Sequence, residues 1–452
     1  MKRIQRIATL GSTAILLVSG WYGLAYAGID MGRTVTNARC EAGAFMTHST
    51  KIGGKDDSSS NDQASATDNF DPAPSAKLVG ANLIANPGLE TLVTNLPKSW
   101  QASTYGNNTS VFSKVAGHSS ASAVRIDVSD YRDGSSSWYY NPIKVTAGSY
   151  YVYSEAYRSN APTRPILAVT YADGTVKYVN LMNAPISGEW ARYNISFFVP
   201  TGAVSVSVYH ALTTNGWLET DDYALTQAIA QGFNQARVSI TFDDGWKSIH
   251  DNALPVLQDH GFVSTQYLIS GYLGQAKSYM SVADVYDLRA AGSEIASHTV
   301  DHLDLTKQSA KDATYQLTRS QQDLQKCFGQ STDFAAPYGT YNQSTLTTTS
   351  EHYQTARSTD VGYNSADSLN PYHLKVQNVD AETTPAQMRD WLQTAKANNL
   401  WLILVYHQVD ADGSQYARST QQFAADMQAI DNSKVAVQTV DQAYTQISQK
   451  AR

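Results

Sequence analysis

The sequence has only two cysteines, Cys40 and Cys327, among its 452 residues. Two cysteines are too few for the disulfide framework of a small secreted domain. We expect Cys327 to be a buried thiol, because it shares the apolar face of a predicted helix with Ala313, Leu317 and Leu324. The sequence also lacks long runs of Lys or Arg, and its formal net charge is −7. This charge argues against a nucleic-acid partner, and a neutral or polysaccharide ligand fits better.

Apolar runs of membrane-spanning length are missing as well, except at the N-terminus, where residues 7–27 are uncharged. Three basic residues precede this run, and "AYA" ends it with a small-x-small cleavage site. We therefore predict a signal peptide over residues 1–27, with an uncleaved membrane anchor as the alternative. Both interpretations predict a secreted or cell-surface protein.

The rest of the chain divides into three parts with different patterns. Residues 28–77 are rich in Ser, Asp, Gly, Ala and Thr without periodicity, which predicts a disordered linker. Over residues 78–227, short runs such as "GSYYVYSEAY" and "AVSVSVYHAL" are separated by turns, which predicts an antiparallel β-sandwich. Over residues 233–449, apolar runs such as "VSITF" and "WLILVYH" alternate with amphipathic segments, which predicts a parallel sheet or barrel.

Four segments of this last part place polar residues at the ends of expected strands: "SITFDDGW", "EIASHTVDH", "FAAPYG" and "LILVYH". The carboxyl ends of parallel strands converge on one edge, where catalytic residues collect. His298 and His302, joined to one carboxylate of the Asp243–Asp244 pair, suit zinc or a similar divalent metal. Taken singly, the Asp-Gly step is typical of a turn, and a histidine pair is typical of a surface or core.

Together and in this order, the four segments resemble the polysaccharide deacetylases of the NodB-homology group, carbohydrate esterase family 4, over about residues 236–445. The resemblance implies a distorted (β/α) barrel that removes N-acetyl groups from a polysaccharide containing N-acetylglucosamine. The metal expected is zinc, with cobalt or nickel as alternatives. The implied roles are catalytic base for Asp243, general acid for His407, metal ligands for Asp244, His298 and His302, and oxyanion or substrate binding for Pro337 and Tyr338.

The third motif departs from the family pattern. Many members have "RxPY", whose Arg orients the catalytic base, whereas "FAAPYG" places Ala335 at that position. No counterpart of the usual fourth-motif Asp and Trp is recognisable. In this respect the sequence resembles the members that act on exported poly-N-acetylglucosamine. The partner of Asp243 is left open: Lys375 is a candidate, although a solvated lysine is the more ordinary interpretation.

The β-rich part resembles jelly-roll carbohydrate-binding modules through "NLIANPGLE" near its start and "LETDDYAL" near its end. This resemblance implies a structural calcium, for which Glu90 and Asp222 are candidate ligands. Aromatic side chains could stack on sugar rings or fill the core, and we expect only one or two to be exposed. The candidates are Trp100, Trp138, Tyr139, Trp190 and Trp217.

Two other functions compete with N-deacetylation. An O-acetyl esterase acting on xylan would use the same metal site. A catalytically inactive polysaccharide-binding protein would be free to lose the base, the acid or the ligands. This sequence retains all five residues, which favours an enzyme.

Overall fold

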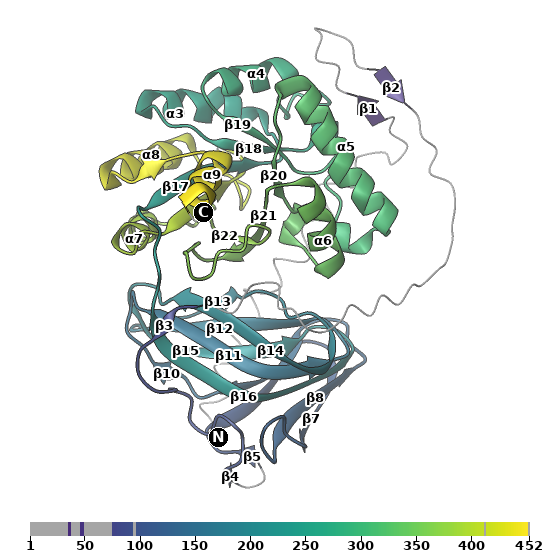
Figure 1. Cartoon of the computed structure of the whole chain (residues 1–452), viewed down its shortest axis with the longest axis vertical. Coiled ribbons are helices and arrows are strands. Elements are labelled where there is room, and N and C mark those ends of the chain that lie inside the picture. Colours follow the sequence, from purple (N-terminus) through teal and green to yellow (C-terminus); the bar gives the residue numbers. More distant parts are fainter. Residues whose placement is uncertain (1–34, 38–45, 49–74, 94–95, 411–412, 451–452) are drawn as a thin grey trace. The chain divides into compact units, whose positions relative to one another are not determined.

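The computed structural model describes residues 35–37, 46–48, 75–93, 96–410 and 413–450 (Figure 1). The predicted signal peptide or anchor lies outside these residues, as does most of the predicted linker. Within the linker range, β1 (Val35–Asn37) and β2 (Met46–His48) pair as a short antiparallel hairpin. Among the described residues, no helix is both long and apolar enough to span a membrane.

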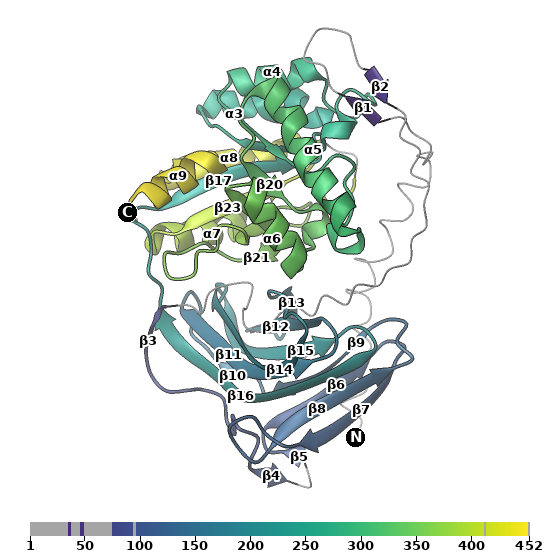
Figure 2. The same ribbon diagram turned by 45° about the vertical axis from the view of Figure 1, so that its right-hand side comes forward.

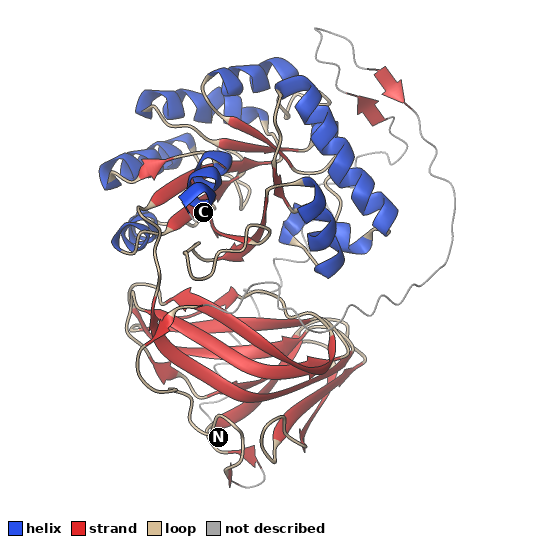
Figure 3. Ribbon diagram, in the orientation of Figure 1, coloured by secondary structure: helices blue, strands red, loops and turns tan. Residues whose placement is uncertain are grey.

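Residues 77–229 form the antiparallel β-sandwich (Figure 3). Sheet I has the strand order β13-β12-β15-β9-β6, with β10 also paired to β15, and sheet II has the order β14-β11-β16-β8-β7, with β3 also paired to β16. The bounds of sheet I are β6 (Trp100–Tyr105), β9 (Ser135–Tyr140), β10 (Ile143–Lys144), β12 (Thr163–Tyr171), β13 (Val176–Asn180) and β15 (Ala203–Leu212). Those of sheet II are β3 (Lys77–Leu78), β7 (Thr109–Val115), β8 (Ala123–Ser129), β11 (Tyr150–Ser159), β14 (Ser187–Phe198) and β16 (Gly216–Ile229). A separate hairpin pairs β4 (Leu92–Val93) with β5 (Leu96–Pro97).

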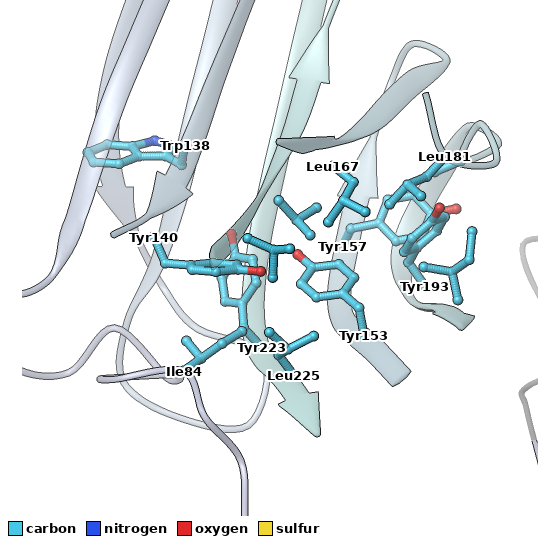
Figure 4. Packing of buried hydrophobic residues seen from close by; sticks show 14 of the residues in the cluster. Ile84, Trp138, Tyr140, Tyr153, Tyr157, Leu167, Leu181, Tyr193, Tyr223 and Leu225 are labelled. Carbon is cyan, nitrogen blue, oxygen red and sulfur yellow. The ribbon is translucent and has the colours of Figure 1, made fainter. Parts of the chain in front are cut away.

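Aromatic side chains from both sheets fill the space between them (Figure 4). Their large apolar area supplies much of the driving force for packing, but each buried hydroxyl needs a hydrogen-bond partner. Tyr193 Oη donates to the carbonyl of Met182 at 2.8 Å, and Tyr157 Oη donates to that of Pro185 at 3.0 Å. The strand pairings show the two predicted antiparallel layers. The assignment of the sandwich as a jelly roll stays a prediction.

Residues 237–450 form a barrel of parallel strands surrounded by helices (Figure 2). Seven strands close the ring in the order β17-β18-β19-β20-β21-β22-β23 and back to β17, and β24 pairs with the start of β17. This confirms the predicted barrel. Because helices cover the outside, β17 and β23 are buried on both faces. The sequence of β23 is a continuous apolar run, whereas that of β17 alternates apolar residues with buried polar ones. The bounds are β17 (Arg237–Asp243), β18 (Thr265–Leu268), β19 (Glu294–Ser297), β20 (Asp333–Ala335), β21 (Thr355–Val361), β22 (Leu374–Asn378), β23 (Trp401–Tyr406) and β24 (Ala436–Val437).

Capping residues define where several barrel helices begin. Ser281, Asn342, Thr384 and Ser419 each accept a hydrogen bond from a backbone N–H in the first turn, within a reciprocal capping box. These helices can therefore start abruptly after the strand-end loops. The bounds are α3 (Leu254–His260), α4 (Val282–Ala290), α5 (Ala310–Phe328), α6 (Gln343–His352), α7 (Pro385–Ala397), α8 (Thr420–Ser433) and α9 (Val440–Lys450).

The structure corrects the prediction for Cys327. Its side chain is buried near the end of α5, as expected from the apolar face, but it is disulfide-bonded and is not a free thiol. Cys40, the other cysteine of the sequence, lies outside the described residues. Apolar periodicity indicates that a cysteine side chain is buried but does not indicate whether it is oxidised.

Candidate active site

The two adjacent carboxylates of "TFDDGW" lie at the carboxyl end of β17. Asp243 is the last residue of the strand, and Asp244 follows it with φ = 72°. The left-handed backbone at Asp244 turns the chain sharply, so the two side chains reach different partners at the same end of the barrel. Asp243 contacts Arg357, whereas Asp244 faces His298 and His302.

Asp244, His298 and His302 bring three metal-ligand atoms together. Oδ1 of Asp244 lies 3.6 Å from Nε2 of His298 and 3.4 Å from Nε2 of His302, and the three ligand atoms lie within 4.8 Å of one another. Oδ1 of Asp244 is buried and accepts no hydrogen bond among the described residues. A buried carboxylate oxygen without a donor is costly unless a cation occupies the space in front of it. Two imidazoles and one carboxylate therefore fit a divalent metal.

The protonation of both histidines also suits metal binding. Nδ1 of His298 lies 2.8 Å from the carbonyl oxygen of Ala335, an acceptor that places the proton on Nδ1 and the lone pair on Nε2. Burial lowers the pKa of His298 well below its ordinary value, and the neighbouring His302 lowers it further. Burial also lowers the pKa of His302. Both imidazoles are therefore neutral near pH 7, as ligation requires.

A buried glutamine holds the loop that carries the two histidines. Oε1 of Gln316, on α5, accepts hydrogen bonds from the backbone N–H groups of Val300 and Asp301 at 3.0 Å each. The backbone is left-handed at Thr299 (φ = 67°) and at His302 (φ = 56°). Non-glycine residues rarely adopt this conformation, so the surrounding hydrogen bonds must enforce the turn. The "HTVDH" segment is thus a shaped loop rather than one turn of a helix.

Arg357, on β21, is the partner of Asp243. Its guanidinium is fully buried, donates Nη2–H to Oδ1 of Asp243, and stacks on the ring of Tyr267 with Cζ 4.4 Å from the ring centroid. Arg357 is the register partner of Ala335 on the neighbouring strand β20. Sequence analysis missed it because no motif marks it. The available signal was a lone arginine within the segment "TARSTDV", which forms β21.

His407 comes directly after β23. Phe242 and Tyr406 are register partners on β17 and β23, so Asp243 and His407 follow at matching positions of adjacent parallel strands. The charge of His407 contributes to the lowered pKa of His302. Nδ1 of His407 is buried and has no hydrogen-bond partner among the described residues. His407 therefore belongs to the same strand-end cluster as the three metal-ligand candidates.

Pro337 and Tyr338 form a short 3-10 turn, Pro337–Gly339, after β20. The backbone at Tyr338 is left-handed (φ = 59°), and its half-exposed ring packs edge-on against His302 with 4.6 Å between centroids. The N–H of Ala336 donates to the carbonyl of Arg357 at 3.0 Å, which fixes this turn to β21. The turn therefore borders the His302 side of the cluster.

Comparison with known proteins bears on this cluster. Residues 230–356, which include Asp243, Asp244, His298, His302 and Tyr338, match the family model described as polysaccharide deacetylase. This part of the chain is therefore similar in sequence to polysaccharide deacetylases. It is 31% identical over 132 residues to the Bacillus subtilis (strain 168) protein named "Putative polysaccharide deacetylase YxkH", a match that covers 29% of this chain and 47% of that protein. The chain thus spans about half the length of this curated relative.

Solved structures similar to this chain include the following two. One is the Xyl-CE4 domain of a multidomain xylanase from the hindgut metagenome of Trinervitermes trinervoides, at 18% identity and a TM-score of 0.36, covering 47% of this chain and 91% of that one. The other is the Streptococcus pyogenes deacetylase PplD in complex with acetate, at 25% identity and a TM-score of 0.33, covering 35% and 70%.

Lys375, the candidate partner of Asp243 from the sequence, has a different environment from the one expected. It lies in β22 of the barrel and is only 5% exposed, so the interpretation as a solvated lysine was wrong. Arg357 holds the position beside Asp243 instead. The long aliphatic part of Lys375 packs against Gly362.

The candidate calcium ligands of the sandwich both contact the segment 118–122. Oε1 of Glu90 accepts a hydrogen bond from the backbone N–H of Ser122 at 2.6 Å. Asp222 lies 2.7 Å from Nδ1 of His118 and accepts from Oγ of Ser119 at 2.7 Å. These donors already satisfy part of each carboxylate, and calcium binding here stays a prediction.

The five candidate aromatic residues of the sandwich separate into two groups. Trp100 and Trp138 are 4% exposed and belong to the core, which excludes them as sugar platforms (Figure 4). Trp190 and Trp217 lie on the outer face of sheet II, and Tyr139 lies on the outer face of sheet I.

Proposed function

We propose that this protein hydrolyses N-acetyl groups of an extracellular polysaccharide that contains N-acetylglucosamine. The observation that carries the proposal is the convergence of Asp243, Asp244, His298, His302 and His407 at one end of a barrel that is similar in sequence, over residues 230–356, to polysaccharide deacetylases. The small residue at Ala335 supports a poly-N-acetylglucosamine substrate, through the resemblance to family members that lack the motif arginine.

Asp244, His298 and His302 would hold the metal, for which we propose zinc, with cobalt or nickel as alternatives. A divalent cation here supplies positive charge that polarises the acetyl carbonyl and makes water more acidic. The ligand set favours such a borderline ion over calcium or magnesium, which prefer oxygen donors.

Asp243 acts as the general base. Its Oδ1 is engaged by Arg357, and Oδ2 accepts no hydrogen bond among the described residues, so that oxygen can take a proton from water. The water oxygen then bonds to the acetyl carbon. The backbone N–H of Tyr338, in the turn after β20, would donate a hydrogen bond to the acetyl carbonyl oxygen as negative charge develops on it.

His407 acts as the general acid. An amine is a poor leaving group until it is protonated, so the C–N bond breaks as His407 gives its proton to nitrogen. The products are acetate and a glucosamine unit of the polymer. The proton that Asp243 took from water later returns His407 to its charged form through solvent.

We further propose that the sandwich binds the polymer and that the chain is exported. The disulfide-bonded state of Cys327 supports export, since disulfides persist mainly in oxidising compartments. The N-terminal basic and apolar residues support the same conclusion.

Acetate release tests the proposed reaction. The purified chain is offered chitin oligomers, β-1,6-linked N-acetylglucosamine polymer, peptidoglycan and acetylxylan, and acetate is measured together with new amines. We expect equal acetate and amine from an N-acetylglucosamine polymer. Acetate from acetylxylan alone would identify an O-acetyl esterase, and binding without any acetate release would identify an inactive polysaccharide-binding protein.

A further inference from the structure

The outer face of sheet I carries a row of tyrosines on a bed of small residues. Tyr139 on β9 and Tyr209 on β15 are register partners. Their rings stack with 4.3 Å between centroids at an interplanar angle of 14°. Tyr178 on β13 stands edge-on to Tyr209 at 6.1 Å and is 53% exposed. Ser and Ala occupy neighbouring outward positions, including Ser137, Ala168, Ser207 and Ala211, all of which are buried.

Hydrogen bonds hold the row in place at one end. Tyr139 Oη donates to Oε1 of Gln101 at 2.8 Å, and Nε2 of Gln101 donates to Oδ1 of Asn141 at 2.6 Å. At the other end Asn180 is the register partner of Ile166, which is in turn opposite Tyr209. Amide groups thus flank the rings on both sides, and Gln101, Asn141 and Asn180 are all exposed.

Charge distinguishes this face from the outer face of sheet II. No carboxylate occurs at the outward positions of the strands of sheet I, and the charged residues among them are Arg164 on β12 and Lys144 on β10. On sheet II, the guanidinium of Arg125 covers the ring of Trp217 at 4.7 Å, and that of Arg158 covers Trp190 at 4.9 Å. Both arginines also pair with Glu219. The indole rings of sheet II are therefore already engaged by cations.

We propose that Tyr139, Tyr209 and Tyr178 form the surface on which the sandwich binds an uncharged polysaccharide of N-acetylhexosamine units. A pyranose ring has an apolar C–H face and a polar edge, so it needs an accessible aromatic ring beside amide or hydroxyl groups. The row provides both: Tyr178 is exposed, and the stacked rings of Tyr139 and Tyr209 are partly exposed. The absence of carboxylates from the face matches a neutral polymer. The inference rests on the proposed polymer binding by the sandwich and does not depend on catalysis.

Binding is measured by affinity electrophoresis of the full chain in gels that contain poly-N-acetylglucosamine. All proteins carry Asp243→Asn so that the polymer stays intact. Replacing Tyr139 and Tyr209 together by Ala should weaken binding by about tenfold or more, since each lost ring contact removes on the order of 1 kcal/mol. Tyr178→Phe should retain binding, whereas Tyr178→Ala should weaken it. Trp190→Ala, on the other sheet, is the matched control and should bind like the parent.

Thermal unfolding of each variant confirms that the sandwich is folded. Unchanged binding by the tyrosine double variant, or loss confined to Trp190→Ala, would overturn the assignment of the face, as would a parent chain that binds no polymer. Acetate release by the unsubstituted chain is measured separately. A chain that binds polymer through these tyrosines but releases no acetate would contradict the proposed reaction and leave this inference standing.

Discussion

Arg357 on β21 forms a buried ion pair with Asp243 on β17, although the residue at the position of the family's motif arginine is Ala335 on β20. The small side chain of Ala335 packs with Tyr267 and Ala296 inside the barrel. Arg357 reaches across from the next strand and lies on the face of Tyr267. An arginine on a different strand thus supplies the positive charge beside the base.

We expect Arg357→Ala to lower kcat by about 10²-fold, because a base that loses its orienting partner is misplaced by enough to slow proton transfer. The protein should also lose about 3–5 kcal/mol of unfolding free energy, since Asp243 would stay buried without a partner. Steady-state kinetics and urea denaturation measure the two effects.

The matched control for this prediction is Arg237→Lys. Arg237 is equally buried on β17, but at the opposite end of the strand, where it donates to the carbonyl of Gln235 and to the side chain of Asn234. This variant should lose stability without a comparable loss of kcat. A similar loss of kcat in both variants would show that Arg357 acts through stability alone.

Metal content provides a second test. His298→Ala should lose bound metal and activity together, because two of three protein ligands rarely hold zinc against dialysis. Elemental analysis of the dialysed protein gives the stoichiometry, with His260→Ala as a control histidine remote from the site at the end of α3. Full metal occupancy in His298→Ala would contradict the assignment of His298 as a metal ligand.

The sequence allowed the barrel and the strand-end cluster to be predicted because both are marked locally. Buried parallel strands are rich in apolar residues. Asp243 ends one such strand, Asp244 and His298 directly follow one, and His302 lies in the loop that begins at His298. The ion pair of Arg357 could not be predicted in this way, because it depends on a contact between positions distant in sequence. The disulfide-bonded state of Cys327 also leaves no mark in the residues around it. The burial of Lys375 was missed for the same reason: residue type alone favours solvent, and only packing reverses it.

Asp243→Asn and His407→Ala test the two proton-transfer roles. Each variant should bind metal normally and lose on the order of 10²- to 10⁴-fold in rate, the usual size of a general acid–base contribution.

Substrates with different leaving groups distinguish the role of the general acid from that of the general base. Aryl acetates expel their leaving group without protonation, so His407→Ala should harm hydrolysis of an N-acetylglucosamine oligomer more than hydrolysis of an aryl acetate. Asp243→Asn should slow both, since water must be activated in each case. Equal losses on the two substrates for His407→Ala would remove it from the acid role.

A second buried acidic pair lies away from the cluster, near the start of β19 and β20. Asp333 is fully buried, whereas Glu294 is partly exposed as a residue but has a buried Oε1. Oε2 of Glu294 accepts hydrogen bonds from Thr265 Oγ1 at 2.9 Å and from the N–H of Asp441, in the first turn of α9, at 3.0 Å. Burial raises the pKa of Glu294 well above its usual value, and the charge of Asp333 raises it further. The folded protein therefore holds a proton on Glu294 that the unfolded chain releases near pH 4.5.

Stability should consequently fall as the pH rises above about 4.5. In this range the folded state binds one more proton than the unfolded state, so the unfolding free energy drops by about 1.4 kcal/mol per pH unit until the folded pKa is passed. Glu294→Gln keeps an oxygen for Thr265 and Asp441 and an N–H donor for Asp333, but it does not titrate, so this contribution to the slope should vanish. Urea denaturation between pH 5 and pH 8 compares it with Glu351→Gln, an exposed glutamate on α6 that should retain the parental slope. The same slope in Glu294→Gln as in the parent would show that this carboxyl is ionised in the folded barrel, with Asp333 rather than Glu294 holding the shared proton.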